Sequence, residues 1–418
     1  MKKTAVKKAV DRADIFKDAK KVFSESYVNM LSEKGHDFLE QDYEGSFTFD
    51  SEGKRYLDCY TSGAVFNLGR KNRAIIQRFK KAIYETDQGN FVMPSHEKAL
   101  LAKRIAEFMP SNLDCVLFGV TRGESMDAAC KLARGFTARP DLVTVDGGCY
   151  GESGFALSLT DRKGKEQFGR LIQGVKVIPF GDIGAAKNAI GAKTAAVVME
   201  PMQVENHCRS ADQGYYQQIR TLCDASGAKL IFDETQSGFG RTGARFFFEQ
   251  IGVQPDILIV GEAITSGIFP MTAMIFTQEL KGFFDIHPLI HLCTFGGHDL
   301  GCMVAMTALD EYDRLEPWEN ASSLGDKLME HLKALAGAYP DLLTSVSGKG
   351  LLISLNFSSH ETAVEFCCGA RAGGLLVNTG RIDPLSVLIR PSLLITPDEV
   401  SQIVEGITKI LNDMKKKG

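Results

Sequence analysis

The sequence has 418 residues, of which 44% are hydrophobic and 24% are charged, and its net charge is −4. This is the composition of a globular protein with room for a large core and a second, smaller lobe. The slight negative charge argues against nucleic acid or an anionic membrane as a partner, and no apolar run reaches the ~18–20 residues of a membrane span.

The chain begins with a basic stretch that no apolar segment follows, so we expect no signal peptide. The ten cysteines are scattered, several of them within apolar segments, and none shows the paired spacing of a metal site. This pattern is typical of reduced, mostly buried thiols. It predicts a cytoplasmic protein without a metal site.

The N-terminal part, residues 1–60, is predicted to form a charged helix followed by a strand pair at 45–50 and 54–60. From about residue 110 to 310, short apolar runs alternate with longer amphipathic segments. Continuous runs of valine, isoleucine and leucine indicate strands covered on both faces, as in a mainly parallel sheet. The expected strands are 114–120, 141–147, 175–180, 195–201, 229–234, 256–261 and 271–276.

Between these strands, segments 125–136 and 214–227 repeat apolar residues at intervals of three and four, which predicts crossover helices. The fold class is therefore α/β, a doubly wound sheet with its ligand site at the carboxyl ends of the strands. Residues 316–418 alternate helices and strands in an α+β pattern. We expect a large α/β domain over 61–315 and a smaller α+β domain made of 316–418 with the segment 1–60.

Two adjacent acids, Asp233 and Glu234, end an apolar strand in the motif DETQSGFGRTG (233–243). This motif resembles the signature of the class III aminotransferases, which are fold type I enzymes that use pyridoxal phosphate. The resemblance implies that Asp233 pairs with the protonated ring nitrogen of the cofactor, since a nearby carboxylate favours the charged pyridinium. It places Gln236 beside the 3-hydroxyl of the ring.

Other motifs extend the resemblance over most of the chain. MEPMQ (199–203) places Glu200 at a strand end near the cofactor, and CTFGGHDLGC (293–302) resembles a segment whose threonine, here Thr294, reaches the cofactor phosphate of the neighbouring subunit. The resemblance thus implies a homodimer with shared sites. In VLIRPSLLITPDEV (387–400), Arg390 takes the place of an arginine that binds the substrate carboxylate, for which a planar guanidinium is suited.

The family carries its cofactor lysine in a segment that resembles PDILIVGEAITSGIFPMTAMIF (255–276), and there this chain has Glu262. No lysine stands between Lys229 and Lys281. A glutamate forms no imine, but it accepts and donates protons, particularly where burial raises its pKa. We therefore expect pyridoxal or pyridoxamine phosphate to be bound without a covalent bond, with Glu262 as the acid and base.

Two further places depart from the family pattern. Where the family has the phosphate loop SGTEA, this chain has Thr121-Arg122-Gly123-Glu124-Ser125, which still begins a helix whose backbone N–H groups suit an anion. We expect Arg122 and Gly123 to lie at the cofactor phosphate. In GGCYGES (147–153), ungapped alignment puts Cys149 at the place of the aromatic residue that stacks on the ring, but we expect Tyr150 to do so, because a thiol does not replace a ring.

These observations predict an aminotransferase-like enzyme that acts on a small amino or keto compound with a carboxylate. Similarity to ornithine-type aminotransferases and to glutamate-1-semialdehyde aminomutase leaves aminomutation open, and elimination from the pyridoxamine form is also open. A catalytically inactive homologue that serves as a partner subunit is the main alternative. Two others are an engineered lysine-to-glutamate change and a different phosphorylated ligand bound by Arg122.

Overall fold

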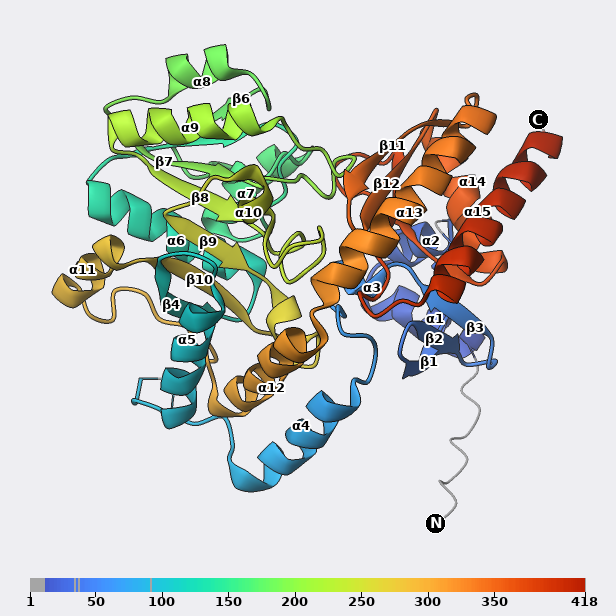
Figure 1. Cartoon of the computed structure of the whole chain (residues 1–418), viewed down its shortest axis with the longest axis horizontal. Helices are drawn as coiled ribbons and strands as arrows, with labels where there is room; N and C mark the ends of the chain where they lie inside the picture. Colours follow the sequence, from blue (N-terminus) through green and yellow to red (C-terminus); the bar gives the residue numbers. More distant parts are fainter. Residues whose placement is uncertain (1–11, 34, 37, 91, 418) are drawn as a thin grey trace.

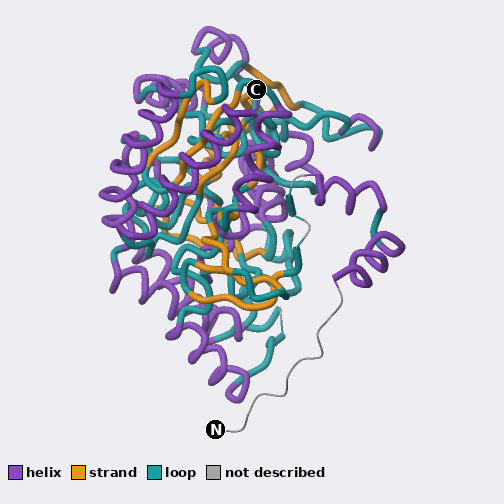
Figure 2. The backbone as a smooth tube through the Cα atoms, turned by 90° about the vertical axis from the view of Figure 1, so that its right-hand side faces the viewer, coloured by secondary structure: helices purple, strands orange, loops and turns teal. Residues whose placement is uncertain are grey.

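The computed structural model describes residues 12–33, 35–36, 38–90 and 92–417. The start of the expected N-terminal helix, residues 1–11, lies outside the described residues. Strands run through the interior of the molecule with helices around them, as the side view in Figure 2 shows. The sheets fall into two groups: a large sheet on the left of Figure 1 and two smaller sheets on the right.

The large sheet has seven strands in the order β4-β10-β9-β8-β7-β5-β6. Strand β10 is antiparallel to both of its neighbours, and the pairs from β9 to β6 are parallel. All seven expected strands are present, with ends shifted by at most two residues. Their bounds are β4 Leu113–Gly119, β5 Asp141–Val145, β6 Val175–Ile178, β7 Thr194–Met199, β8 Lys229–Asp233, β9 Ile257–Val260 and β10 Thr272–Thr277.

Both faces of this sheet are buried. Along β8, Leu230 and Phe232 belong to one hydrophobic cluster, whereas Ile231 between them belongs to another on the opposite face. Because successive side chains of a strand point to opposite faces, a continuous apolar run is required where helices cover both. The α/β fold class predicted from the sequence is therefore confirmed.

Helices pack on both faces of the large sheet. Helix α6 contacts several of its strands on one face and α7 and α11 pack on α6, while α8 and α9 contact strands β6 to β8 and α12 packs on α4 and α5. The expected crossover helices correspond to α6 and α9. The bounds are α3 Thr61–Ala64, α4 Arg73–Glu85, α5 His96–Phe108, α6 Arg122–Thr137, α7 Gly154–Leu159, η1 Lys165–Phe168, α8 Ile183–Ala189, α9 Gln213–Ser226, α10 Phe247–Ile251, η2 Glu262–Thr265, α11 Gln278–Ile286 and α12 Asp299–Leu315.

The two smaller sheets bring the N-terminal and C-terminal segments together. One has the order β1-β2-β3-β13, with Leu57 opposite Leu375, and the other has the order β11-β12-β15-β14. The domain bounds at 60 and 315 stay a prediction. The remaining elements are α1 Arg12–Val22, α2 Glu25–Glu33, β1 Glu40–Glu44, β2 Phe47–Asp50, β3 Arg55–Asp58, α13 Pro317–Ala338, β11 Leu343–Lys349, β12 Leu352–Phe357, α14 His360–Ala372, β13 Leu375–Leu376, β14 Asn378–Thr379, β15 Ser386–Ile389 and α15 Pro397–Lys417.

Among the described residues, none of the helices is both long and apolar enough to span a membrane. Over the same residues, no cluster of three or more histidine, cysteine or acidic side chains is arranged to hold a metal ion. Every cysteine is a free thiol, and all but Cys293 and Cys368 are buried. The expectation of mostly buried thiols is confirmed.

Helix α13 packs directly on the turn between β11 and β12 through two glycines. A Cβ atom on Gly325 would lie 2.3 Å from the carbonyl oxygen of Gly350, whereas a Cβ on Gly337 of the same helix would meet nothing within 4 Å. We expect Gly325→Ala to lower the free energy of unfolding by about 1–3 kcal/mol through overpacking. Gly337→Ala is the control and should leave it unchanged or raise it by up to about 1 kcal/mol. Urea denaturation of both variants checks this, and equal effects would contradict it.

Candidate functional site

Three adjacent strands of the large sheet each end in an acid. Glu200 follows β7, Asp233 ends β8 and Glu262 begins the short 3-10 helix η2 one residue after β9. Strands β7, β8 and β9 are parallel neighbours, so their carboxyl ends meet at one edge of the sheet. This edge is where open α/β sheets bind ligands.

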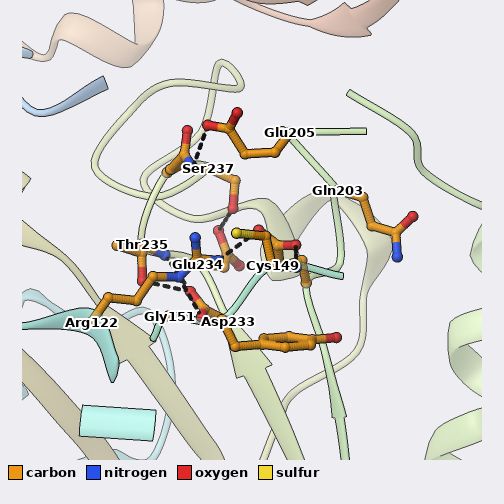
Figure 3. Close-up of polar contacts among 12 residues, drawn as sticks. Arg122, Cys149, Gly151, Gln203, Glu205, Asp233, Glu234, Thr235 and Ser237 are labelled. Atoms are coloured by element: carbon orange, nitrogen blue, oxygen red, sulfur yellow. Dashed lines mark hydrogen bonds and ion pairs between the residues drawn. The ribbon is translucent and has the colours of Figure 1, made fainter. Parts of the chain in front are cut away.

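A single arginine bridges two of these acids. The Nε atom of Arg122 donates to Oδ2 of Asp233 at 2.8 Å, and its Nη2 atom donates to Oε1 of Glu200 at 2.6 Å. The carboxylates are 0% and 2% exposed and the arginine side chain 14%. Figure 3 shows Arg122 extended toward Asp233 rather than toward solvent. We call Arg122, Glu200 and Asp233 the ion triad.

The remaining oxygens of the ion triad also have donors. Oδ1 of Asp233 accepts the backbone N–H of Thr235 at 3.0 Å and its hydroxyl at 2.5 Å, and Oε2 of Glu200 accepts the backbone N–H of Cys149 at 2.9 Å. All four carboxylate oxygens are therefore engaged. Burial and the nearby Asp233 raise the pKa of Glu200, against the opposing effect of Arg122.

Glu262 stands beside the ion triad and is partly buried. Burial raises the pKa of its carboxyl, with Arg122 lowering it and Asp233 raising it to a lesser extent. The residue before it, Gly261, has no room for a side chain, because a Cβ atom there would lie 2.3 Å from Cγ2 of Thr235. The glycine thus lets Thr235 reach Asp233 and fixes the start of η2 against the end of β8.

A second charged cluster surrounds Arg390, which follows β15 and is fully buried. Its Nη1 donates to Oε1 of Glu205 at 3.0 Å and to Oε1 of Gln236 at 2.7 Å, and its Nη2 donates to Oδ1 of Asn378 at 2.8 Å. The guanidinium also lies over the ring of Tyr60, 5.5 Å from its centroid. Burial favours the neutral form of Glu205, yet Arg390 and further donors bring the pKa of this carboxyl below its ordinary value.

The buried Nε of Arg390 has no hydrogen-bond partner. Thr235 belongs to the ion triad's surroundings and the next residue, Gln236, to the Arg390 cluster, so the two clusters are neighbours along the loop after β8. The structure thus brings together Asp233, Glu200, Arg122 and Glu262, and places Gln236 and Arg390 in the second cluster.

Tyr150 lies close enough to the ion triad for Glu200, Asp233 and Arg122 to influence the pKa of its hydroxyl. It is fully buried, and its hydroxyl accepts from Thr144 and donates to the carbonyl of Val198 within the core on the α6 side of the sheet. The residue at the site is Cys149, whose backbone binds Glu200. That Tyr150, rather than Cys149, stacks on the cofactor ring stays a prediction, and its hydroxyl is bonded within the core.

Three other motif residues have clear positions. Gly123, in the first turn of α6, lies against the loop after β5, since a Cβ on Gly151 would lie 2.7 Å from its Cα atom. Thr294 is exposed on the loop between α11 and α12. Glu234 has a structural role, because its carboxylate accepts the backbone N–H groups of Phe247 and Phe248 at the start of α10.

A cavity of about 580 Å³ opens beside the two clusters. Cys149 and Asn378 line it, together with Glu152, Arg162 and Arg381 at its rim. The described residues that line this cavity include neither the ion triad nor Glu262. The cavity thus reaches the backbone that binds Glu200 and the amide that binds Arg390, but it ends before Asp233.

The model of the family described as aminotransferase class-III matches residues 32–411. The chain belongs to the class-III aminotransferase family. A curated relative, an uncharacterized aminotransferase of Archaeoglobus fulgidus, is 33% identical over 396 residues, which cover 95% of this chain and 93% of the relative. The putrescine aminotransferase of Pectobacterium atrosepticum is 31% identical over 375 residues, covering 87% and 80% of the two chains.

Solved structures of aminotransferases have the same fold. The ornithine aminotransferase of Toxoplasma gondii superposes with a TM-score of 0.91 at 22% identity, covering 98% of this chain and 97% of the other. An (S)-enantioselective omega-transaminase of Thermomicrobium roseum gives 0.89 at 26% identity, covering 96% and 98%. The fold type I assignment is confirmed, and the homologues support an enzyme of the transaminase type.

Class-III aminotransferases depend on pyridoxal phosphate, so this cofactor or its amine form is consistent with family membership. The donor set fits a non-covalently bound form. Asp233 and Arg390 supply an acceptor for a ring nitrogen and a cation for a carboxylate, but the segment from 230 to 280 has no lysine to form an imine. Asp233 is also already bound by Arg122, which would have to release it.

The sequence did not single out several residues that complete the clusters. Glu205, Thr235 and Asn378 contact charged groups of the site directly. Glu205 could have been found, because it follows Glu200 by five residues in the same loop and Arg390 needs a counter-charge if buried. Asn378 gives no such signal, since only the tertiary fold brings β14 beside Arg390.

The raised pKa of Glu262 predicts a specific pH dependence of stability. In the folded protein this carboxyl retains its proton above the ordinary glutamate value of 4.5, so its contribution to stability is present at low pH and is lost as the pH rises through the folded pKa. We expect Glu262→Gln, which stays neutral, to gain stability relative to the wild type as the pH rises from about 4 to about 8.

Chemical denaturation at several pH values measures this difference, with Glu166→Gln, at an exposed position, as the control for the change in net charge. If the difference in free energy of unfolding between Glu262→Gln and the wild type stays constant with pH, burial does not raise the pKa of Glu262.

Proposed function

We propose that this chain is a class-III aminotransferase-family enzyme that binds pyridoxal or pyridoxamine phosphate without a covalent bond, and that Glu262 stands in place of the Schiff-base lysine as acid and base. Its substrate is a small amino or keto compound with a carboxylate. The observation that carries this proposal is the position of Glu262: partly buried, at the carboxyl end of β9, beside Asp233 and with a raised pKa.

The other residues have the roles of binding and orientation. Asp233 would accept the protonated ring nitrogen, Gln236 the 3-hydroxyl, and the first turn of α6, with Gly123, would face the phosphate. Arg390 would bind the substrate carboxylate after exchanging Gln236 or Glu205 for it, because both now occupy its Nη1. The bound ring supplies an electron sink.

Glu262 then exchanges a proton with the substrate. A carboxyl whose pKa lies closer to neutrality both accepts and donates protons efficiently. Since a glutamate forms no imine, residue 262 offers no amine to displace the product from the cofactor. Conventional lysine-dependent transamination should therefore be slow. Aminomutation and elimination from the pyridoxamine form are the reactions in this family that this loss affects least.

The second candidate function is that of an inactive homologue, a partner subunit or scaffold without turnover. The bond between Arg122 and Asp233 favours it, because the acid that would bind the ring nitrogen already has a cation. The retained pair of Asp233 and Arg390, each at an edge of the site, favours the enzyme.

The two functions differ in a binding measurement. We expect the purified wild type to bind pyridoxamine phosphate more tightly than pyridoxal phosphate, because the positive amine group is attracted to Glu262. Glu262→Gln removes the negative charge of residue 262. It should reduce the ratio of the two dissociation constants by about tenfold, which corresponds to one charge contact of roughly 1.4 kcal/mol. Fluorescence and absorbance titrations give both dissociation constants.

Glu262→Lys tests the scaffold in the same experiment. An absorbance band that appears with pyridoxal phosphate and disappears on borohydride reduction would show that the pocket still presents residue 262 to the cofactor. Binding of neither form to the wild type would reject the enzyme and favour the inactive homologue.

We also propose a homodimer in which Thr294 reaches the partner's site. Large apolar side chains are exposed in the segment that leads to Thr294, which monomers rarely display together. They are Ile286 at 74%, Leu289 at 65%, Ile290 at 54%, Leu292 at 48% and Phe295 at 55% exposed. The cytoplasm stays the predicted location.

Sedimentation of the wild type should therefore give the mass of two chains. The double variant Ile290→Glu/Phe295→Glu should dissociate at concentrations where the wild type does not, because it places charges in an apolar contact. Phe168→Glu, which changes another exposed phenylalanine, at 68%, is the control and should not dissociate. A wild type that sediments as a monomer would contradict the dimer.

A further inference from the structure

We propose that Arg122 is a built-in counter-ion of Asp233 that substitutes for the cofactor's protonated ring nitrogen in the cofactor-free protein and competes with it for binding. This inference rests on the proposed function only in taking pyridoxal or pyridoxamine phosphate as the ligand. It revises the expectation from the sequence that Arg122 contacts the cofactor phosphate.

The position of Arg122 is fixed by the helix that carries it. Arg122 is the first residue of α6, and the preceding Thr121 caps this helix by accepting the backbone N–H of Glu124. A cation at a helix N-terminus is disfavoured by the helix dipole. The side chain instead turns to the edge of the sheet, where two carboxylates offset that cost.

The charges of the ion triad require a cation at this place. Asp233 and Glu200 end neighbouring strands and are almost fully buried, so without a counter-ion they would repel each other in a region of low dielectric. Burial disfavours the charged guanidinium, but Asp233 and Glu200 more than compensate and raise the pKa of Arg122 above its ordinary value. The arginine stays charged and offsets the repulsion between the two acids.

A protonated ring nitrogen and Arg122 would compete for the same oxygen of Asp233. Oδ1 is bound by the backbone and hydroxyl of Thr235, which Gly261 keeps in place, so it is not readily released. Oδ2 accepts from a side chain of another element, Nε of Arg122 at the start of α6. The protonated ring nitrogen must therefore replace Nε of Arg122, while Nη2 keeps Glu200 as its partner.

The cavity agrees with this competition. It extends to Cys149, whose backbone binds the same Glu200 that Arg122 holds, and ends before Asp233. In the cofactor-free protein one cation already lies between Asp233 and Glu200, unlike a site in which these two acids have no cation.

The test is Arg122→Gly, which installs the residue that the resemblance places here. In the full-length protein we expect this variant to bind pyridoxamine phosphate about tenfold more tightly or better than the wild type, since a buried charge pair no longer has to be broken. Intrinsic fluorescence of pyridoxamine phosphate follows binding without turnover. Asp233→Asn should abolish the gain when combined with Arg122→Gly.

Two further variants make the result specific. Arg314→Gln removes an exposed arginine of α12, which pairs with Glu311 and does not line the cavity, and should leave the affinity unchanged. Arg122→Gly/Glu200→Gln removes one cation and one anion together. It should fold even if the single variant, left with two unpaired buried carboxylates, does not, and should show the same gain.

The outcomes separate this inference from the proposed function. Tighter binding of pyridoxamine phosphate by the Arg122 variants supports the inference. This holds even if the wild type binds nothing, a result that would reject only the proposed function of the natural chain. A wild type that binds as tightly as the variants, or more tightly, overturns the inference alone and makes Arg122 a ligand of the phosphate. Binding by none of them overturns both.

Discussion

The guanidinium of Arg122 lies between two buried carboxylates, and this contact determines what the edge of the large sheet can do. Three parallel strands deliver acids to one place, and repulsion between Glu200 and Asp233 would destabilise the fold there without a cation. In this chain the cation comes from the first turn of α6. Both acids therefore already have a cationic partner within the protein.

The Arg390 cluster follows the same logic. Its guanidinium is fully buried and is satisfied by Glu205, Gln236 and Asn378, apart from the unpaired Nε. Each cluster thus carries a cation whose partners belong to the protein.

Departures from the family pattern are linked in space although they are far apart in the sequence. Arg122 and Glu262 both surround Asp233, and Gly261 provides the room in which Thr235 binds that same acid. The altered residues form one contiguous environment around a single carboxylate.

The sequence by itself determined the α/β class, the seven strands of the large sheet and the acids at their ends, because continuous apolar runs have few other solutions and parallel strands align their carboxyl ends. It also determined the family, through motifs at β8 and β15. Only the tertiary structure decided which way side chains point. Arg122 turned to Asp233 and Glu200 because a buried charge takes the nearest counter-charge, and the hydroxyl of Tyr150, in the loop after β5, found its partners in Thr144 and Val198 within the core.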